Sequence, residues 1–394
     1  MIEICKDLFW VGIKDWELKK FHGDEFTTEN GSTYNSYIIK GTEKTVLVDT
    51  CWGPFKEAYI ENLEQTIGLA NIDALICQHT ESDHSGAMMA LLEKRPDLPI
   101  YCTAMGKSFL HSQYPREWNC TTVKTGDKLD IGGYTLLFIE APMLHWPDSM
   151  FTYVMGMEAL LPNDAFGQHY VTGSLYNDEV DQCVLWQEAM KYFANIVAPY
   201  AKMVRPKIDQ FKALGLPLSL ICPSHGVIWR ENPMQIVDKY DEWAGEYKED
   251  QVVILYDTMW LETRAMAEAL GRGVTKAGMS AKVINAARTD VTHILTEAFR
   301  SAGIMVGSPT INNGISHAMA AVMEGLKHLK LKKKQGAAFG AYGWSGEGPG
   351  ILKKLLEDAG VAVEAEPIRQ IHRPTPEDLC RLEAFGEAFV RGLQ

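Results

Sequence analysis

The chain has 394 residues, of which 46% are hydrophobic and 23% charged, and its formal net charge is −13. This composition predicts a globular protein of two or three domains, and the sequence has no apolar run of about eighteen residues that would indicate a membrane-spanning helix. The acidic charge argues against nucleic acid as a partner, because phosphate binding needs a basic surface.

The cysteines and the first residues bear on location. The stretch MIEICKDLFW lacks the basic segment and apolar core of a secretory signal. None of the eight cysteines is spaced C-x-x-C, so we expect no iron–sulfur or rubredoxin-type site on this chain. Several lie in apolar, strand-like segments, which suits buried, reduced thiols. We therefore expect a cytoplasmic protein.

Strand-like and helix-like segments alternate in residues 1–249. Apolar patterns predict strands at 33–41, 44–50 and 72–79, a helix at 55–68, and hairpin-like pairs over 128–142 and 150–164. A helical stretch over roughly 178–215, a last strand within 217–226 and a helix at 232–248 follow. The polar segment 246–250 predicts a domain boundary near residue 250.

Residues 250–394 show a different pattern. Five short apolar segments, at 252–257, 281–286, 303–307, 336–340 and 361–366, predict strands separated by helices. That alternation is typical of a doubly wound parallel sheet. An amphipathic segment at 376–393 predicts the last helix. The expected fold class is therefore α/β.

Seven potential metal ligands lie in the first 225 residues: His79, Glu81, Asp83, His84, His145, Asp164 and His225. In an extended loop the first three would face one way, because alternate residues share a side. Asp83 and His84 can serve a second metal, although Asp83 alone could complete that site. The last three each follow an apolar strand, so the loops can converge on one pocket. Imidazole with carboxylate ligands suits iron or manganese as well as zinc.

Three other residues near these motifs have open roles. Asp49 ends a predicted strand and could orient a ligand histidine or cap a helix. His22 and His169 lie in loops close to the motifs, and we expect them to be structural or to support the ligands.

Three loops of the second half have the form of a flavin site, each at the carboxyl end of a predicted strand, where doubly wound sheets bind ligands. No G-x-G-x-x-G follows the first strand, which argues against a dinucleotide fold. Hydroxyls and amides at a helix start suit the FMN phosphate, and exposed aromatics suit its ring. The expected FMN contacts are Thr258, Met259, Trp260, Leu261, Thr263, Ser308, Pro309, Thr310, Asn312, Asn313, Gly340, Tyr342, Gly343, Trp344, Ser345 and Gly346.

Both halves resemble the flavodiiron proteins, also called A-type flavoproteins, over nearly the whole chain. The run H-x-E-x-D-H ends at His84, and His145, Asp164 and His225 follow at the family's spacings. The words MLHWPDSM, NDAFGQ and CPSHGVI, and then YDTMW, GSPT-x-NNG and AFG-x-x-GWSG, are also similar to the family's.

The resemblance implies a metallo-β-lactamase-like αβ/βα sandwich over 1–249 with two non-haem irons, then a flavodoxin-like domain over 250–394 with FMN. It implies that His79, Glu81 and His145 hold one iron, that Asp83, His84 and His225 hold the other, and that Asp164 bridges them. No catalytic residue beyond the ligands is implied.

The implied activity is reduction of dioxygen to water, of nitric oxide to nitrous oxide, or of both. Electrons would pass from a separate donor, a rubredoxin-like protein or a reduced cofactor, through FMN to the irons. The family also implies a head-to-tail homodimer or a dimer of dimers.

Two features depart from the family. Glu262 stands in the phosphate loop where members commonly have serine or threonine, and its charge would repel a phosphate. The chain also shows no rubredoxin or flavin-reductase extension after the flavodoxin-like part. Two alternatives remain at this point: a dizinc hydrolase fused to a flavodoxin module, and an electron carrier or redox sensor with a vestigial metal site.

Overall fold

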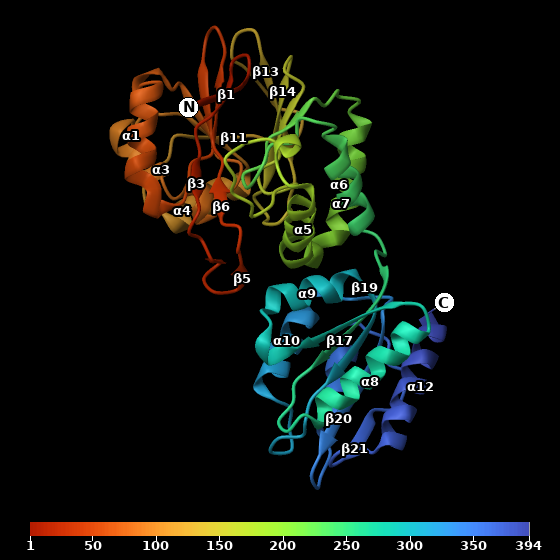
Figure 1. The fold of residues 1–394 in the computed structure, drawn as a ribbon. Coiled ribbons are helices and arrows are strands. Elements are labelled where there is room, and N and C mark those ends of the chain that lie inside the picture. The colour runs from red at the N-terminus through yellow and green to blue at the C-terminus, as the bar shows by residue number, and fades with distance from the viewer. Residues whose placement is uncertain (394) are drawn as a thin grey trace. The chain divides into compact units, whose positions relative to one another are not determined.

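The computed structural model describes residues 1–393 and divides into two compact units (Figure 1). The first unit comprises residues 1–24 and 28–244, and the second comprises residues 25–27 and the chain from Gly245 onward. No helix in the described part of the chain is long and apolar enough to cross a membrane.

Two sheets form the centre of the first unit. A seven-stranded sheet has the order β1-β2-β7-β8-β9-β10-β11, and a five-stranded sheet has the order β12-β13-β14-β15-β16. The strands of the larger sheet are β1 (Ile2–Cys5), β2 (Leu8–Trp10), β7 (Tyr37–Lys40), β8 (Thr45–Val48), β9 (Ala74–Ile76), β10 (Ile100–Cys102) and β11 (Cys120–Thr122). Those of the smaller are β12 (Lys128–Asp130), β13 (Thr135–Glu140), β14 (Met150–Met155), β15 (Ala159–Leu161) and β16 (Leu220–Ile221). Four further short strands are β3 (Ile13–Asp15), β4 (Lys20–Phe21), β5 (Phe26–Thr27) and β6 (Ser32–Tyr34), of which β3 pairs with β6.

The two sheets pack face to face over one apolar core. Ile39 and Val48 of the larger sheet and Phe138 and Val154 of the smaller one belong to the same buried cluster. Burial on one face explains the alternation along the strands, because successive side chains of a strand point to opposite faces. Helices flank this sandwich on its two sides (Figure 1), which gives the αβ/βα architecture expected for this part of the chain.

The helices of the first unit run in chain order around the sheets. They are η1 (Gly53–Phe55), α1 (Lys56–Thr66), η2 (Leu69–Asn71), α2 (Ser82–Ser85), α3 (Met88–Lys94), α4 (Ala104–Gln113), η3 (Asn177–Glu179), α5 (Gln182–Tyr192), the π-helix η4 (Phe193–Val197), η5 (Ala198–Tyr200), α6 (Ala201–Ala213) and α7 (Met234–Trp243). The helical stretch expected over roughly 178–215 is thus a series of segments with a π-helical turn in its middle.

The second unit is a parallel five-stranded sheet with helices on both faces (Figure 1). Its order is β18-β17-β19-β20-β21, from β17 (Glu249–Tyr256), β18 (Ser280–Asn285), β19 (Ser301–Gly307), β20 (Gln335–Tyr342) and β21 (Ile368–Ile371). The helices are α8 (Glu262–Lys276), η6 (Ala286–Arg288), α9 (Val291–Arg300), α10 (His317–Leu329), α11 (Gly348–Asp358) and α12 (Pro376–Leu393). The expected doubly wound fold and the expected last helix are confirmed.

The fifth predicted strand is wrong. Residues 361–366 form only an isolated bridge between Ala362 and Gln335, whereas the edge strand is β21, further along the chain. Val361 and Val363 are nevertheless buried, so the apolar alternation reflects packing without a strand ladder. An edge strand needs less apolar sequence, which is why β21 gave a weaker signal.

Candidate metal centre and flavin loops

The seven potential ligands lie in four loops at one end of the sandwich. The run from His79 to His84 follows β9, and His145 lies between β13 and β14. Asp164 follows β15, and His225 follows β16. All seven converge into two adjacent groups of donor atoms: His79, Glu81, His145 and Asp164 form one, and Asp83, His84 and His225 form the other.

The first group surrounds one oxygen of Glu81. Its Oε2 lies 3.2 Å from Nε2 of His79 and 3.4 Å from Nε2 of His145. Both imidazoles are buried, with exposed side-chain fractions of 0% and 9%. The donors therefore meet at a point that water reaches little.

The second group is equally enclosed. Oδ2 of Asp83 lies 3.1 Å from Nε2 of His225 and 3.3 Å from Nε2 of His84. His84, whose role the sequence left open, is buried and directs its Nε2 into this group.

Asp164 stands between the two groups. Its Oδ1 lies 3.0 Å from Nε2 of His84 and 3.3 Å from Nε2 of His225. Its Oδ2 lies 3.4 Å from Nε2 of His145 and 3.7 Å from Nε2 of His79. One carboxylate oxygen thus faces each group, which is the arrangement of a ligand that bridges two cations.

Several of these buried atoms lack hydrogen bonds. Within the described residues, both carboxylate oxygens of Asp83 and of Asp164 and Nε2 of His84 have no hydrogen-bond partner. Buried polar atoms are normally satisfied, and buried charges are normally paired or bound to a metal. Nitrogens and oxygens that approach closely without hydrogen-bond geometry fit a shared metal ion between them.

The loop from His79 to His84 is not extended throughout, as the sequence reading assumed. His79 and Glu81 do share one group, but the chain enters the short helix α2 at Ser82, and this turn moves Asp83 into the second group. The expectation that His79, Glu81 and Asp83 face the same way is therefore wrong for Asp83. The helical turn lets one short segment supply both groups.

Hydrogen bonds fix the orientation of two ligand histidines. Nδ1 of His79 donates to the buried carboxylate of Asp148, at 3.1 and 3.2 Å. Nδ1 of His225 donates to the carbonyl of Thr33 at 2.6 Å. Both acceptors lack a proton, so the second nitrogen of each ring is left as an electron-pair donor that faces the ligand groups.

Asp148 was missed by the sequence reading, which considered Asp49 for this role. Asp148 also accepts from the backbone and the hydroxyl of Thr80, each at 2.8 Å, so it fixes the loop as well as the ring. Its only sequence signal is a carboxylate three residues after His145 in the word MLHWPDSM.

Asp49 supports the site from further away. It is buried and accepts from the backbone and the amide of Gln78, next to ligand His79. It also accepts from the amide of Asn163, next to ligand Asp164. Asp49 therefore ties together the backbones that carry two of the ligands.

Charges in the site shift the histidine pKa values upward. Burial disfavours the imidazolium form, but the nearby carboxylates of Asp164 and Glu81 outweigh it and raise the pKa of His145 to about 9. Burial is likewise outweighed by Asp164 and Asp83 at His225, whose pKa is raised to about 10. Such a field, negative at the centre of a buried pocket, also attracts cations, and metal binding there must displace protons.

His22 and His169 lie beside the ligands, as expected. Nε2 of His22 is 2.9 Å from Oε1 of Glu81, the oxygen turned away from the first group. His169 is buried, its Nδ1 is 2.8 Å from the hydroxyl of Ser32, and its ring centroid is 5.2 Å from that of His225. Both residues therefore pack around ligands and are not part of either donor group.

The first flavin loop connects β17 to α8. Leu261 precedes the helix with φ 73° and no side chain caps the helix start. The hydroxyls of Thr258 and Thr263 are buried and have no hydrogen-bond partner among the described residues. Unused amides and hydroxyls at the start of a 15-residue helix fit a phosphate group. Glu262, the first helical residue, is only partly buried.

The second and third flavin loops follow β19 and β20. The hydroxyl of Ser308 is occupied within its own loop, because it donates to the carbonyl of Pro309 and accepts from the backbone of Ser316. Asn312 and Asn313 form a turn with φ of 48° and 60°. Gly340 lies so close to the carbonyl oxygen of Ser308 that a Cβ would come within 2.0 Å of it.

The remaining expected flavin contacts lie on the surface of these loops. Trp260 is 74% exposed and Trp344 is 88% exposed, which is unusual for tryptophan. Gly343, beside Trp344, has open space where a side chain would point. Exposed flat side chains around an open loop fit an aromatic ring that would cover them.

Two family models match the chain. The model described as ODP family beta lactamase matches residues 33–226, and the model described as flavodoxin matches residues 254–379. These ranges contain the seven metal-ligand candidates and the three flavin loops, respectively.

Similar proteins cover nearly the whole chain. The anaerobic nitric oxide reductase flavorubredoxin of Klebsiella pneumoniae is 45% identical over 387 residues, which are 96% of this chain and 80% of that protein. The solved rubredoxin oxygen:oxidoreductase of Desulfovibrio gigas is 34% identical with a TM-score of 0.96, covering 99% of this chain and 98% of that one. The flavodiiron protein of Giardia intestinalis is 31% identical with a TM-score of 0.95, covering 100% and 96%.

A metallo-β-lactamase-like unit with a buried dinuclear donor set, joined to a flavodoxin unit, defines a two-cofactor redox protein. The chain belongs to the flavodiiron proteins. Its cofactors are FMN and two non-haem irons, and the unsatisfied donors of both units fit these groups. The resemblance seen in the sequence is confirmed.

Proposed function

We propose that this protein reduces nitric oxide to nitrous oxide, dioxygen to water, or both, with electrons that reach a diiron pair through FMN. The observation that carries this proposal is the position of Asp164, whose two oxygens face two separate groups of imidazoles and carboxylates. Relatives named for nitric oxide reduction and for oxygen reduction both support it.

The seven side chains would divide between two irons. His79, Glu81 and His145 would hold one iron, and Asp83, His84 and His225 would hold the other. Asp164 would bridge them. Glu81, in particular, adds an anionic oxygen to a site otherwise rich in imidazole, and hard anionic ligands suit iron.

When bound, the two cofactors supply the redox chemistry, and the protein places and shields it. Asp148 and the carbonyl of Thr33 keep the rings of His79 and His225 in the ligating tautomer. The edge of the Trp146 ring packs against His79, with the centroids 5.0 Å apart. Burial of the donors limits water at the point where the gas would react.

In the flavodoxin unit, the amides at the start of α8 with Thr258 and Thr263 would bind the FMN phosphate. Trp260, Tyr342 and Trp344 would lie against the ring. The other loop positions expected from the sequence would line the site through their backbone.

The source of the electrons and the assembly are further parts of the proposal. We propose a separate donor, either a rubredoxin-like protein or a reduced cofactor, and a head-to-tail homodimer or dimer of dimers. The name of the Desulfovibrio gigas relative supports a rubredoxin donor. We also propose a cytoplasmic location, because all eight cysteines are free thiols.

Anaerobic stopped-flow spectroscopy tests the function. The fully reduced protein would be mixed separately with nitric oxide and with dioxygen, and flavin oxidation would be followed. We expect rapid, multiple-electron oxidation by at least one gas, with nitrous oxide or water as the product. A Glu81→Ala, His225→Ala variant should lose this reaction. If the double variant turned over either gas at the wild-type rate, the metal site would be vestigial and the proposal would fail.

A further inference from the structure

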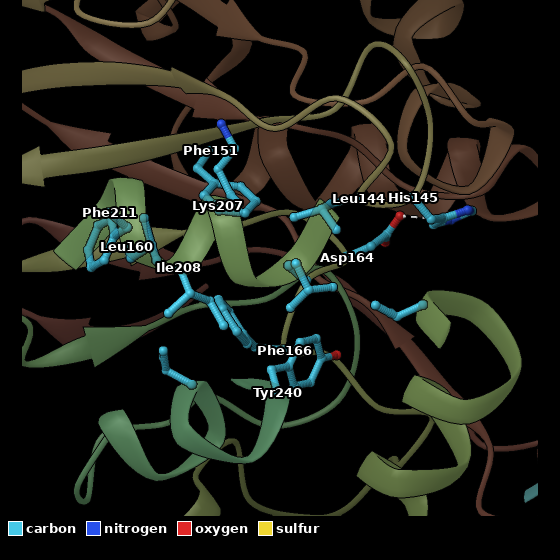
Figure 2. Close-up of a pocket in the computed structure, with 14 residues that line it drawn as sticks. Leu144, His145, Phe151, Leu160, Asp164, Phe166, Lys207, Ile208, Phe211 and Tyr240 are labelled. Atoms are coloured by element: carbon cyan, nitrogen blue, oxygen red, sulfur yellow. Dashed lines mark ion pairs between the residues drawn. The ribbon is translucent and has the colours of Figure 1, made fainter. Parts of the chain in front are cut away.

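A small enclosed cavity adjoins the metal ligands in the first unit (Figure 2). Its volume is about 20 Å³. It lies between the outer face of the smaller sheet and helices α6 and α7. Strand alternation explains its walls, because Phe151 and Leu160 point away from the core between the sheets, toward the helices.

The cavity is apolar except at its ends. Ten of the fourteen residues around it are alanine, valine, leucine, isoleucine or phenylalanine. The polar exceptions include two of the metal ligands, His145 and Asp164, and Figure 2 shows them together at one side. The cavity is thus continuous with the walls of the metal site.

The opposite end is closed by Lys207. Of the residues around the cavity, all of which lie in the described part of the chain, only Lys207 is not buried. Figure 2 shows it on the side away from His145. Its amine donates to the carbonyl of Glu140 and to Oε1 of Gln210, so its aliphatic part lies across the end of the cavity.

The helical wall is irregular where it covers the cavity. Val197 ends the π-helical turn η4, and Pro206 interrupts the hydrogen bonding of α6 beside Lys207. A π-turn and an internal proline both remove regular helix hydrogen bonds, and π-turns are frequent at functional sites. This wall is therefore the part of the first unit best able to open for a small molecule.

We propose that this cavity is a docking site for a neutral diatomic gas on its way to His145 and Asp164. The inference rests on the proposed function and identifies where dioxygen or nitric oxide waits and enters. An apolar cavity of this size stays dry, because a water molecule there would lack hydrogen-bond partners. A neutral gas needs none, and it avoids the cost of opening a hole in water.

Two variants fill the cavity with one extra methylene each: Val204→Ile on α6 and Val237→Ile on α7. Both residues are buried and line the void. The matched control is Val154→Ile, which makes the same change at a fully buried position on β14 that does not line the cavity. The melting temperature should be kept or raised by the first two changes and lowered by the control, because only the control overpacks a filled region.

Xenon provides a readout that does not depend on turnover, since it binds dry apolar cavities. We expect crystals of the wild-type protein under xenon pressure to show xenon between Leu160, Phe166 and Ile208, and crystals of Val204→Ile or Val237→Ile to lack it. Absence of xenon from the wild-type cavity would overturn the proposal.

Gas kinetics complete the test. With iron and FMN contents equal to wild type, the second-order rate of oxidation of the reduced protein should fall several-fold in both cavity variants and stay unchanged in Val154→Ile. Unchanged rates in the cavity variants, or an equal fall in the control, would contradict the inference while leaving the proposed function intact. If the wild-type protein reacted with neither gas, the proposed function would fail, and no gas path to a reaction site could then be claimed.

Discussion

Nδ1 of His79 and the carboxylate of Asp148 form a fully buried pair, with both side chains 0% exposed. The carboxylate also accepts two hydrogen bonds from Thr80, so its position is fixed independently of the ring. This relationship decides which nitrogen of His79 can bind a metal. It also shows that a residue outside the donor groups controls the donor set.

Asp148→Asn should weaken iron binding with little change in fold. The amide oxygen can still accept from Thr80, which turns the amide nitrogen toward His79 and forces the proton onto the ligating Nε2. Loss of such a supporting partner typically costs about 10- to 100-fold in metal affinity. Iron loss to a chelator measures the effect.

The exposed Asp97→Asn change serves as the control for this experiment, since Asp97 lies on the surface of the same unit. Iron retention equal to wild type in Asp148→Asn would show that the hydrogen bond does not set the ligating state of His79.

Removing the unused hydroxyls of the phosphate loop should weaken FMN binding. Thr263→Val and Thr258→Val keep the shape but delete the donor. A hydrogen bond to a charged group contributes about 1.5–3 kcal/mol, so the FMN dissociation constant should rise roughly 10- to 100-fold. Fluorescence titration of the apoprotein with FMN measures it.

The apoprotein itself should be as stable as wild type or slightly more so, because a buried hydroxyl without a partner is removed. A large fall in apoprotein stability with unchanged FMN affinity would assign these threonines to the fold and not to the phosphate.

Glu262→Gln should have the opposite effect on FMN. Glu262 is the first residue of α8 and places a negative charge next to the expected phosphate. Neutralising it should lower the FMN dissociation constant several-fold at low salt, and the difference should shrink as salt screens the charge. The apoprotein should lose about 0.3–1 kcal/mol, because a carboxylate at a helix start stabilises the helix.

Glu364→Gln, an exposed change that precedes β21, is the matched control and should alter neither quantity. FMN affinity unchanged by Glu262→Gln at every salt concentration would mean that the Glu262 side chain does not act on the phosphate.

Lys334 should make the stability of the second unit depend on pH. Burial and the neighbouring Lys248 lower the pKa of Lys334 to about 7. Its amine donates to the carbonyls of Phe299 and Ser301, at 2.6 and 2.5 Å. Between that pKa and the ordinary value the unfolded chain binds a proton that the folded chain does not. Stability should therefore rise with pH there, by at most about 1.4 kcal/mol per pH unit.

Urea unfolding monitored by flavin fluorescence, at pH values from about 7 to 9, measures this slope. Lys334→Met should abolish it, and Lys282→Met, at an exposed position on β18, should preserve it. Parallel pH profiles for the wild-type protein and Lys334→Met would contradict the assignment.

The sequence predicted most of the fold because its signals are local. Alternating apolar residues marked the strands, and the segment 376–393 matched α12. The strand expected at 361–366 failed because a buried extended segment and a paired strand have the same apolar pattern, and only β20 selects β21 as its neighbour.

The donor set was also predictable, since ligand residue types at strand ends are visible in one dimension. The division of the run His79–His84 between two groups was not, because it depends on the turn into α2. Asp148 escaped prediction because a single aspartate has many possible roles, and only the fold brings it to His79. The apolar cavity depends on packing between distant segments and has no sequence signal.

Mössbauer spectroscopy of protein grown with isotope-enriched iron tests the central claim, that the seven convergent side chains hold two irons, most directly. We expect two inequivalent iron sites in equal amounts, magnetically coupled through a shared bridge, and FMN in the same preparation. Zinc in both positions after growth in iron-replete medium would instead favour the dizinc hydrolase, and a single uncoupled iron would contradict the bridging position of Asp164.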